Sequence, residues 1–209
     1  IFQDLLQKLS DRYDYVFFDI GPSLGAINRC VLLACDYFIM PMSSDIFSLK
    51  AVDNIAESLS NWKANIDKGL VDFQKNNEGE PYVVRSAVAS ANLHFLGYIY
   101  QQYNTKSKDG VKRPVKAYDN IIKKMNDLVS SKLGKFCDPR LADSQLLIGE
   151  IPTLNSLIPL SQIAHKPIFS LSSGDGVVGA HFSKVREYEE VVKGILEKMN
   201  ANLNVYEMA

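Results

Sequence analysis

The sequence predicts an α/β fold with a doubly wound, mostly parallel sheet that carries helices on both faces. Two runs of large apolar residues, Tyr15–Phe18 and Tyr37–Met40, show no polar alternation, which is typical of strands covered on both faces. Between and after these runs, apolar residues recur at helical spacing. Strands that alternate with helices favour a parallel sheet, and 209 residues suit a single domain over positions 1–209.

The helices are predicted from the spacing of apolar residues and from terminal signals. One helix over Phe2–Leu9 precedes the first apolar run, and another over Ile27–Ala34 follows it. A long helix begins at Asp45, a residue type that caps helices, and residues 63–84 are its extension followed by a surface loop. A further helix starts at Pro114 and stops at Gly134, and the last begins near Gly179. The long helix places these residues on one face: Val52, Ile55, Ala56, Leu59 and Trp62.

Asp19 is the first candidate functional residue. The apolar run stops near this acid and passes into a glycine- and proline-containing turn, Gly21–Gly25. Open α/β sheets bind their ligands at the carboxyl ends of the strands. An acid placed there can orient the water shell of Mg²⁺, because this ion keeps most of its waters and takes few direct carboxylates. A helix N-cap or turn aspartate is the alternative interpretation.

Several segments resemble, in the same order, motifs of the ParA/MinD family of P-loop ATPases. Asp19–Gly25 resembles the Walker B segment of that family, and Asp36–Leu49 resembles its next strand and helix start. Leu96–Asn104 is similar to a later strand of the family, and Ile151–Thr153 with Lys166–Ile168 is similar to its "Ile-Pro-Arg" and "Gly-Lys-Pro-Ile" motifs. The resemblance extends from Tyr13 to about Met199, and the chain is identified as ParA-like.

The resemblance implies ATP and Mg²⁺ as cofactors and assigns roles to particular residues. Asp19 becomes the acid on the magnesium side, acting through water, and Gly21 and Pro22 become part of the catalytic turn. Gln101, Pro152 and Thr153 become a wall beside the adenine. The alternative for these three residues is structural: a polar residue at a strand end, and a proline at the first position of a helix with a threonine beside it.

The phosphate-binding loop of the family is absent from the sequence. No Gly-x-x-x-x-Gly-Lys-[Ser/Thr] pattern occurs in the 209 residues, and in the family this loop lies well before Walker B. We therefore expect the chain to be the later part of a longer polypeptide, a P-loop NTPase fold whose N-terminal part is missing, and inactive alone. A relative that naturally lacks the loop is the alternative. Gly21 also replaces the first proline of the family's turn, which loosens the backbone there.

A basic region lies between Asn104 and Lys124. Seven lysines and arginines oppose two aspartates, so seven minus two gives a local charge of +5. Such asymmetry can mark a surface that contacts the phosphates of DNA, with Lys112 and Arg113 as candidate contacts, and ParA relatives bind DNA nonspecifically. A solvated loop and helix face is the alternative. The basic residues are Lys106, Lys108, Lys112, Arg113, Lys116, Lys123 and Lys124.

The resemblance implies an ATPase whose hydrolysis drives nucleotide-dependent dimerisation in plasmid or chromosome partitioning, or in positioning another cargo. It implies a homodimer in the ATP state and a ParB-like partner. The second hypothesis is a non-hydrolysing adaptor with the same fold. A Rossmann dehydrogenase is disfavoured, because no Gly-x-Gly-x-x-Gly follows a predicted strand. No apolar stretch reaches the ~20 residues that span a bilayer, so we expect a cytoplasmic protein without a membrane partner.

Overall fold

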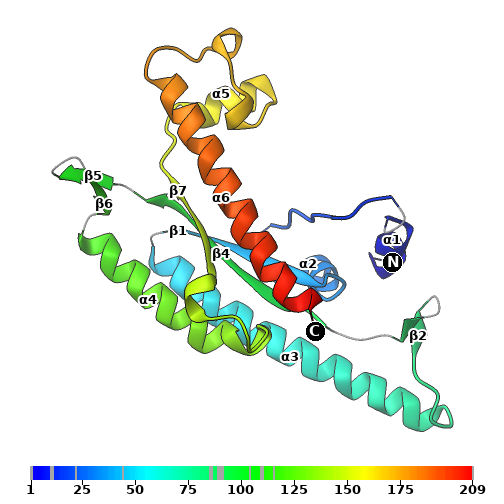
Figure 1. The fold of residues 1–209 in the computed structure, drawn as a ribbon. Coiled ribbons are helices and arrows are strands. Elements are labelled where there is room, and N and C mark those ends of the chain that lie inside the picture. The colour runs from blue at the N-terminus through cyan, green and yellow to red at the C-terminus, as the bar shows by residue number, and fades with distance from the viewer. Residues whose placement is uncertain are drawn as a thin grey trace. The chain divides into compact units, whose positions relative to one another are not determined.

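A three-stranded sheet confirms the predicted α/β fold (Figure 1). Its strands lie in the order β1-β4-β7, where β1 is Tyr37–Ser43, β4 is His94–Tyr103 and β7 is Leu147–Pro152. β4 and β7 run parallel. The His94 amide donates to the Asp36 carbonyl at 2.8 Å. The amino-terminal ends of β1 and β4 are therefore level, as in a parallel pair.

This computed structural model describes residues 2–9, 12–21, 23–43, 45–84, 87–88, 92–103, 105–108, 111–114 and 116–208. The chain divides into two compact units, residues 1–38 with 51–95 and residues 39–50 with 96–209. The single domain predicted over positions 1–209 stays a prediction. The helices are α1 (Phe2–Leu9), α2 (Ala26–Leu32), α3 (Ile46–Asn76), α4 (Lys116–Leu133), α5 (Leu157–Ala164) and α6 (His181–Glu207). The shorter elements are β2 (Val83–Val84), β3 (Ala87–Val88), β5 (Thr105–Lys108), β6 (Val111–Pro114), η1 (Gly134–Phe136), η2 (Asp143–Gln145), η3 (Ile168–Ser170) and η4 (Ser173–Asp175).

The long helix predicted from Asp45 is confirmed as α3. The Ser48 amide donates to Asp45 Oδ1 at 2.7 Å, so Asp45 is the N-cap that the sequence predicts. The apolar face is buried over Val52, Ile55, Ala56 and Leu59. From residue 63 onward the helix is mostly exposed, and an exposed turn follows Asn76. The expected extension and surface loop are therefore both present, but the last two residues of the predicted loop form β2.

The apolar run Tyr15–Phe18 does not form the strand that the sequence predicts. Residues 15–20 lie outside helix and strand, and exposure alternates along them, with Tyr15 58% and Phe17 74% exposed. This alternation is that of an extended chain. An extended segment becomes a strand only when its backbone groups pair with a neighbour. No strand in the described part of the chain pairs with this segment.

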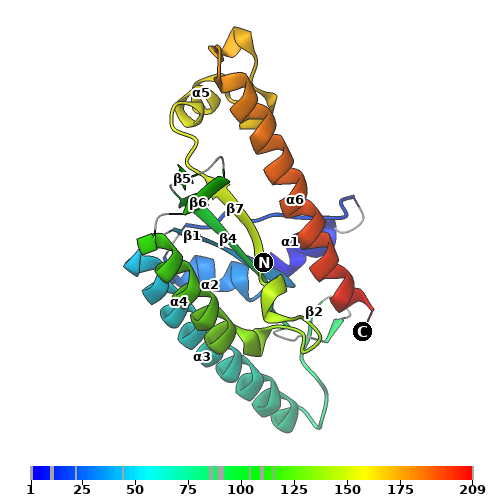
Figure 2. The ribbon, with the colours of Figure 1, turned by 60° about the vertical axis from the view of Figure 1, so that its left-hand side comes forward.

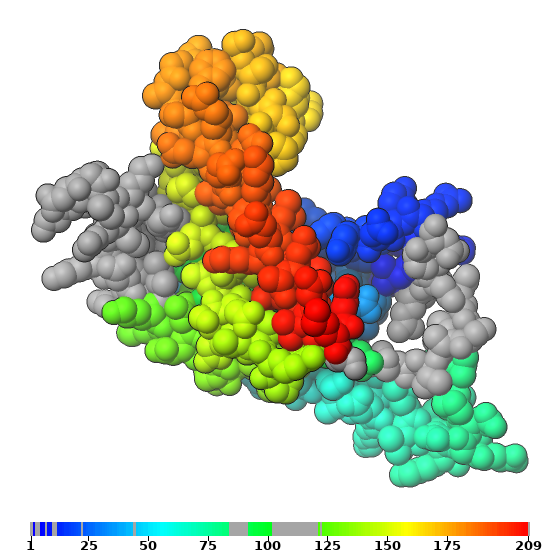
Figure 3. Space-filling view, viewed as in Figure 1, coloured from blue at the N-terminus to red at the C-terminus, as the bar shows by residue number. Residues whose placement is uncertain are grey.

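The second unit is layered, with α4 and α6 on opposite faces of the β4–β7 pair (Figures 1 and 2). On one face, the Tyr98 hydroxyl donates to Asn126 Oδ1 of α4. The next residue, Ile99, pairs with Gly149 of β7, and Gly149 lies against Ile195 of α6. The views in Figures 1 and 2 show these helices on different sides of the strand pair. Figure 3 shows α6, in orange to red, directly against the yellow-green chain that includes β7.

Two glycines let this layer pack closely. A Cβ on Gly149 would lie 2.3 Å from Ile195 Cγ1, so only glycine allows α6 to approach β7 this closely. Gly97 has φ +140°, and a Cβ there would lie 2.5 Å from the Leu146 carbonyl oxygen. Gly97 is therefore required both by its backbone conformation and by space.

Asn202 of α6 is a buried polar residue whose amide is paired. Its Nδ2 donates to the Leu96 carbonyl at 2.9 Å and to the Gln145 carbonyl at 3.0 Å. The side chain is 2% exposed. One amide therefore joins α6 to the sheet and to the turn before β7.

The connection from β7 to α6 has its own small core. Lys166 Nζ and Asp175 Oδ1 form an ion pair at 2.8 Å, and Asp175 also accepts hydrogen bonds from the amide and hydroxyl of Ser172. The hydrogen bond from Lys166, followed by those from Ser172, lowers the pKa of Asp175 to about 2. The buried side chains of this core are Leu154, Leu157, Leu171, Val177 and Val185.

Strands β5 and β6 form an antiparallel pair in the basic region. Lys106 pairs with Arg113, and Ser107 pairs with Lys112. Pro114 ends β6, and α4 begins at Lys116. The helix start predicted at Pro114 is therefore wrong by two residues, because Pro114 belongs to a strand that its sequence did not predict.

Candidate functional site

The turn after Asp19 lies in the first unit, and Asn28 of α2 holds it. Asp19 is exposed, as are Gly21 and Ser23. The Asn28 amide nitrogen lies 2.8 Å from the Gly21 carbonyl oxygen and 2.8 Å from that of Ser23. It also lies 3.2 Å from Ser23 Oγ. Pro22, a predicted member of the turn, lies outside the described residues.

The residues predicted to form a wall beside the adenine lie at one edge of the sheet in the second unit. Gln101 of β4 pairs with Ile151 of β7, and Tyr103 pairs with Pro152. Thr153 directly follows the end of β7. Gln101, Pro152 and Thr153 are all half-buried. The structure thus brings these three residues to the carboxyl ends of two parallel strands, where open α/β sheets bind ligands. Their role in binding a nucleotide stays a prediction.

The loop that leaves this edge is fixed by contacts that sequence reasoning missed. Asn155 has a left-handed backbone with φ 45°, and Leu154 is buried in the small core. Ser156 Oγ lies 3.1 Å from Nε2 of His181, the first residue of α6. His181 Nδ1 is buried and has no hydrogen-bond partner in the described part of the chain. Protonation on Nε2, which then donates to Ser156, is the tautomer that leaves no buried donor unpaired.

Lys112 and Arg113 lie on β6 of the antiparallel pair. Their register opposite Ser107 and Lys106 brings basic positions of both strands close along the backbone. Contact with DNA stays a prediction for both residues.

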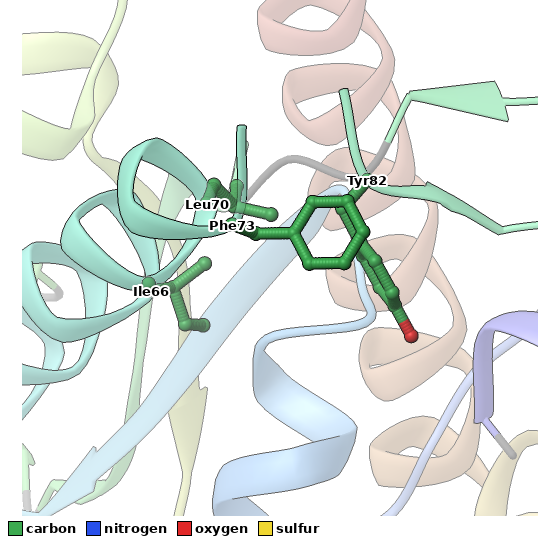
Figure 4. Close-up of a pocket in the computed structure, with 5 residues that line it drawn as sticks. Ile66, Leu70, Phe73 and Tyr82 are labelled. Carbon is green, nitrogen blue, oxygen red and sulfur yellow. The ribbon is translucent and has the colours of Figure 1, made fainter. Parts of the chain in front are cut away.

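An apolar groove lies in the first unit near the carboxyl end of α3 (Figure 4). It is lined by Ile66, Gly69, Leu70, Phe73 and Tyr82. The rings of Phe73 and Tyr82 meet edge to face, with centroids 5.0 Å apart. None of these lining residues is charged, so the groove does not have the chemistry of a phosphate site.

Comparison with known proteins finds ParA-like relatives of the chain. A family model described as an AAA domain matches residues 1–71, which include Asp19, its turn and α2. A virulence plasmid ParA family protein of Chlamydia psittaci, pGP5-D, is 28% identical over 118 residues, which are 56% of this chain and 42% of that protein. The chain is therefore similar to ParA-like P-loop ATPases. This confirms the resemblance that the sequence motifs indicate.

Other relatives of the ParA-like chain match over shorter segments. The chromosome partitioning protein ParA of Myxococcus xanthus is 26% identical over 68 residues, 32% of this chain and 24% of that protein. The crystal structure of protein DIP2308 from Corynebacterium diphtheriae shares the fold, with a TM-score of 0.51 and 24% identity over 74% of this chain and 49% of that one. The ParA-like chain spans less than half the length of the curated relatives it matches.

The described residues hold neither a membrane span nor a cluster of metal ligands. Among the helices of the described ranges, none combines the length and apolar character needed to cross a membrane. The same residues contain no group of three or more His, Cys, Asp or Glu side chains that could hold a metal ion.

Proposed function

We propose that the intact ParA-like protein hydrolyses ATP with Mg²⁺ and that the ATP state is a homodimer acting in plasmid or chromosome partitioning, or in positioning another cargo. The names of two relatives support the biological role: one is a virulence plasmid ParA family protein, and one is a chromosome partitioning ParA. The proposal includes a cytoplasmic location and a partner protein of the ParB type.

The exposed carboxylate of Asp19, placed directly before a restrained turn, is the observation that carries the proposal. It lies within residues 1–71, the segment matched by the family model. Mg²⁺ prefers oxygen ligands and is usually bound by one or two carboxylates together with waters and substrate phosphates. A single exposed carboxylate fits that pattern. We assign Asp19 to the water shell of Mg²⁺, and Gly21 and Pro22 to the adjacent catalytic turn.

We assign Gln101, Pro152 and Thr153 to the wall beside the base of the nucleotide. Their support is the register of β4 and β7, which brings them to one edge of the sheet. Half-buried side chains of mixed polarity suit a base, which offers both a flat apolar face and polar edges.

The test is the substitution Asp19→Ala in the intact protein. We expect ATP turnover to fall at least tenfold, which corresponds to about 1.4 kcal/mol of lost transition-state stabilisation, while the fold is retained. Asp14→Ala is the matched control, because Asp14 is also an exposed aspartate next to the same segment. Turnover is measured by phosphate release, and folding by circular dichroism.

Two results would contradict this proposal in different ways. Unchanged turnover in Asp19→Ala would remove Asp19 from the mechanism. ATP binding without turnover in the unsubstituted protein would favour the non-hydrolysing adaptor.

We also propose that the β5–β6 pair binds DNA through Lys112 and Arg113. The slope of log binding constant against log salt concentration changes by roughly 0.9 for each DNA phosphate that the protein no longer neutralises. Reversing both charges should therefore reduce the slope by about 2. Lys68→Glu with Lys75→Glu is the matched control, since both lysines are exposed on α3. If titrations of the ATP-bound protein give the same slope for all variants, the basic region does not contact DNA, and the alternative interpretation of a solvated surface holds.

A further inference from the structure

The side-chain amide of Asn28 lies against the turn that follows Asp19. It has two N–H groups, and two carbonyl oxygens, those of Gly21 and Ser23, lie at 2.8 Å from its nitrogen. Both distances are ideal for N–H···O hydrogen bonds. The Asn28 amide therefore donates to two carbonyls of the same turn.

Packing does little to hold the turn, so its geometry depends on these hydrogen bonds. Gly21, Ser23, Leu24 and Gly25 are all exposed. Glycine also has more backbone freedom than any other residue. A Cβ on Gly21 would meet no atom within 4 Å, and the backbone there is not left-handed. Neither space nor backbone conformation requires glycine at this position. Because Gly21 is flexible and packs against little, its backbone needs a restraint from another residue, and the Asn28 amide provides one.

We propose that Asn28 is a positioning residue for ATP hydrolysis, whose amide fixes the turn between Asp19 and α2. This inference rests on the proposed function. Asp19 is two residues before Gly21, so fixing the Gly21 carbonyl also restricts the path of the chain at Asp19. Catalytic groups misplaced by about 1 Å can lower a rate by about 100-fold. Asn28 would act on the rate through the turn, without touching the nucleotide itself.

The rival explanation is that Asn28 only stabilises the start of α2. A hydrogen bond of this kind contributes about 0.5–1.5 kcal/mol to folding, so a merely structural role would lower stability and leave the turnover of the folded protein unchanged. A positioning role instead lowers kcat at an unchanged KM for ATP. It also predicts that another way of restraining Gly21 restores the rate.

The experiment compares Asn28→Ala, Gly21→Pro and the double variant in the intact protein. Proline fixes φ and removes the freedom of glycine, and no backbone hydrogen bond from the Gly21 amide occurs among the described residues. We expect Asn28→Ala to lower kcat about tenfold, equivalent to about 1.4 kcal/mol, with KM for ATP unchanged. The double variant should regain at least threefold. Gly21→Ala is a milder restraint should the proline variant fail to fold, because the site has room for a Cβ.

Asn77→Ala is the matched control. Its amide also donates to a backbone carbonyl, that of Phe73, at 2.7 Å on the exposed end of α3. It should leave kcat unchanged. No ATP turnover in the unsubstituted protein would contradict the proposed function itself. If the unsubstituted protein is active and Asn28→Ala leaves kcat unchanged, this inference alone is overturned. It is also overturned if kcat falls only in proportion to the loss of folded protein and the Gly21 substitutions do not restore it.

Discussion

The substitution Gly149→Ala tests the close packing of β7 against α6. A Cβ at this position lies 2.3 Å from Ile195 Cγ1 and 2.9 Å from Cδ1, whereas carbon atoms in contact are about 3.5 Å apart or more. Ile195 must therefore withdraw by about 1.2 Å, which is 3.5 minus 2.3. Overpacking of this kind costs about 1–3 kcal/mol. For a protein of this size, 2 kcal/mol lowers the Tm by roughly 4–8 °C.

The assay is urea unfolding of the intact protein, followed by circular dichroism. Gly194→Ala on α6 makes the same chemical change where a Cβ meets nothing within 4 Å, so it should raise the stability of the helix by about 0.5–1 kcal/mol. The double variant Gly149→Ala with Ile195→Ala should be destabilised by at least 1 kcal/mol less than the sum of the two single effects, because the clash is gone. Single effects that add within about 0.5 kcal/mol would refute the close approach of Gly149 and Ile195.

Two further predictions concern the connection between β7 and α6. Nitrogen NMR of His181 should show the neutral ring protonated on Nε2, since Nδ1 is buried without a partner among the described residues. An Nδ1–H tautomer, in which the Ser156 hydroxyl would donate to Nε2, would contradict this prediction. The pKa of Asp175, lowered to about 2 by Lys166 and Ser172, lies below the usual value near 4. The ion pair therefore stabilises the fold above about pH 4, and this contribution disappears as the pH falls toward 2. Thermal melts of wild type and Asp175→Asn should differ at pH 6 and converge at pH 2, and a constant gap would oppose this assignment.

Periodicity was sufficient to predict α3, because one face of the helix is buried over several turns and its N-terminus carries a capping residue. The same approach failed at Tyr15–Phe18. Large apolar side chains favour an extended chain, but a strand also needs a neighbour with which to pair, and a local sequence does not report that neighbour. Strands β5 and β6 were missed because their residues are mostly polar and show no apolar alternation. The Asp109-Gly110 dipeptide was the available signal, since such pairs favour tight hairpin turns.

The residues of the candidate site were predicted unevenly. The motif at Asp19 indicated the turn that Asn28 holds in the structure, and its catalytic role stays a prediction. The order of strand-end motifs indicated Gln101 and Pro152, which the sheet brings together. Asn28 was missed because its hydrogen bonds reach back five and seven residues, a spacing that belongs to no standard capping motif. His181 was missed because its partner, Ser156, is 25 residues away, and only the folded connection brings them together.

The two hydrogen bonds of Asn202 have a consequence for the order of folding. They join residues separated by 106 and 57 positions along the chain, so they can form only after β4 and the turn before β7 have been placed. Interactions of such long range are costly in loop entropy and tend to form late. Breaking them should therefore leave the refolding rate nearly unchanged and accelerate unfolding. The contacts of α6 therefore act mainly on the unfolding rate, and so on the lifetime of the folded second unit.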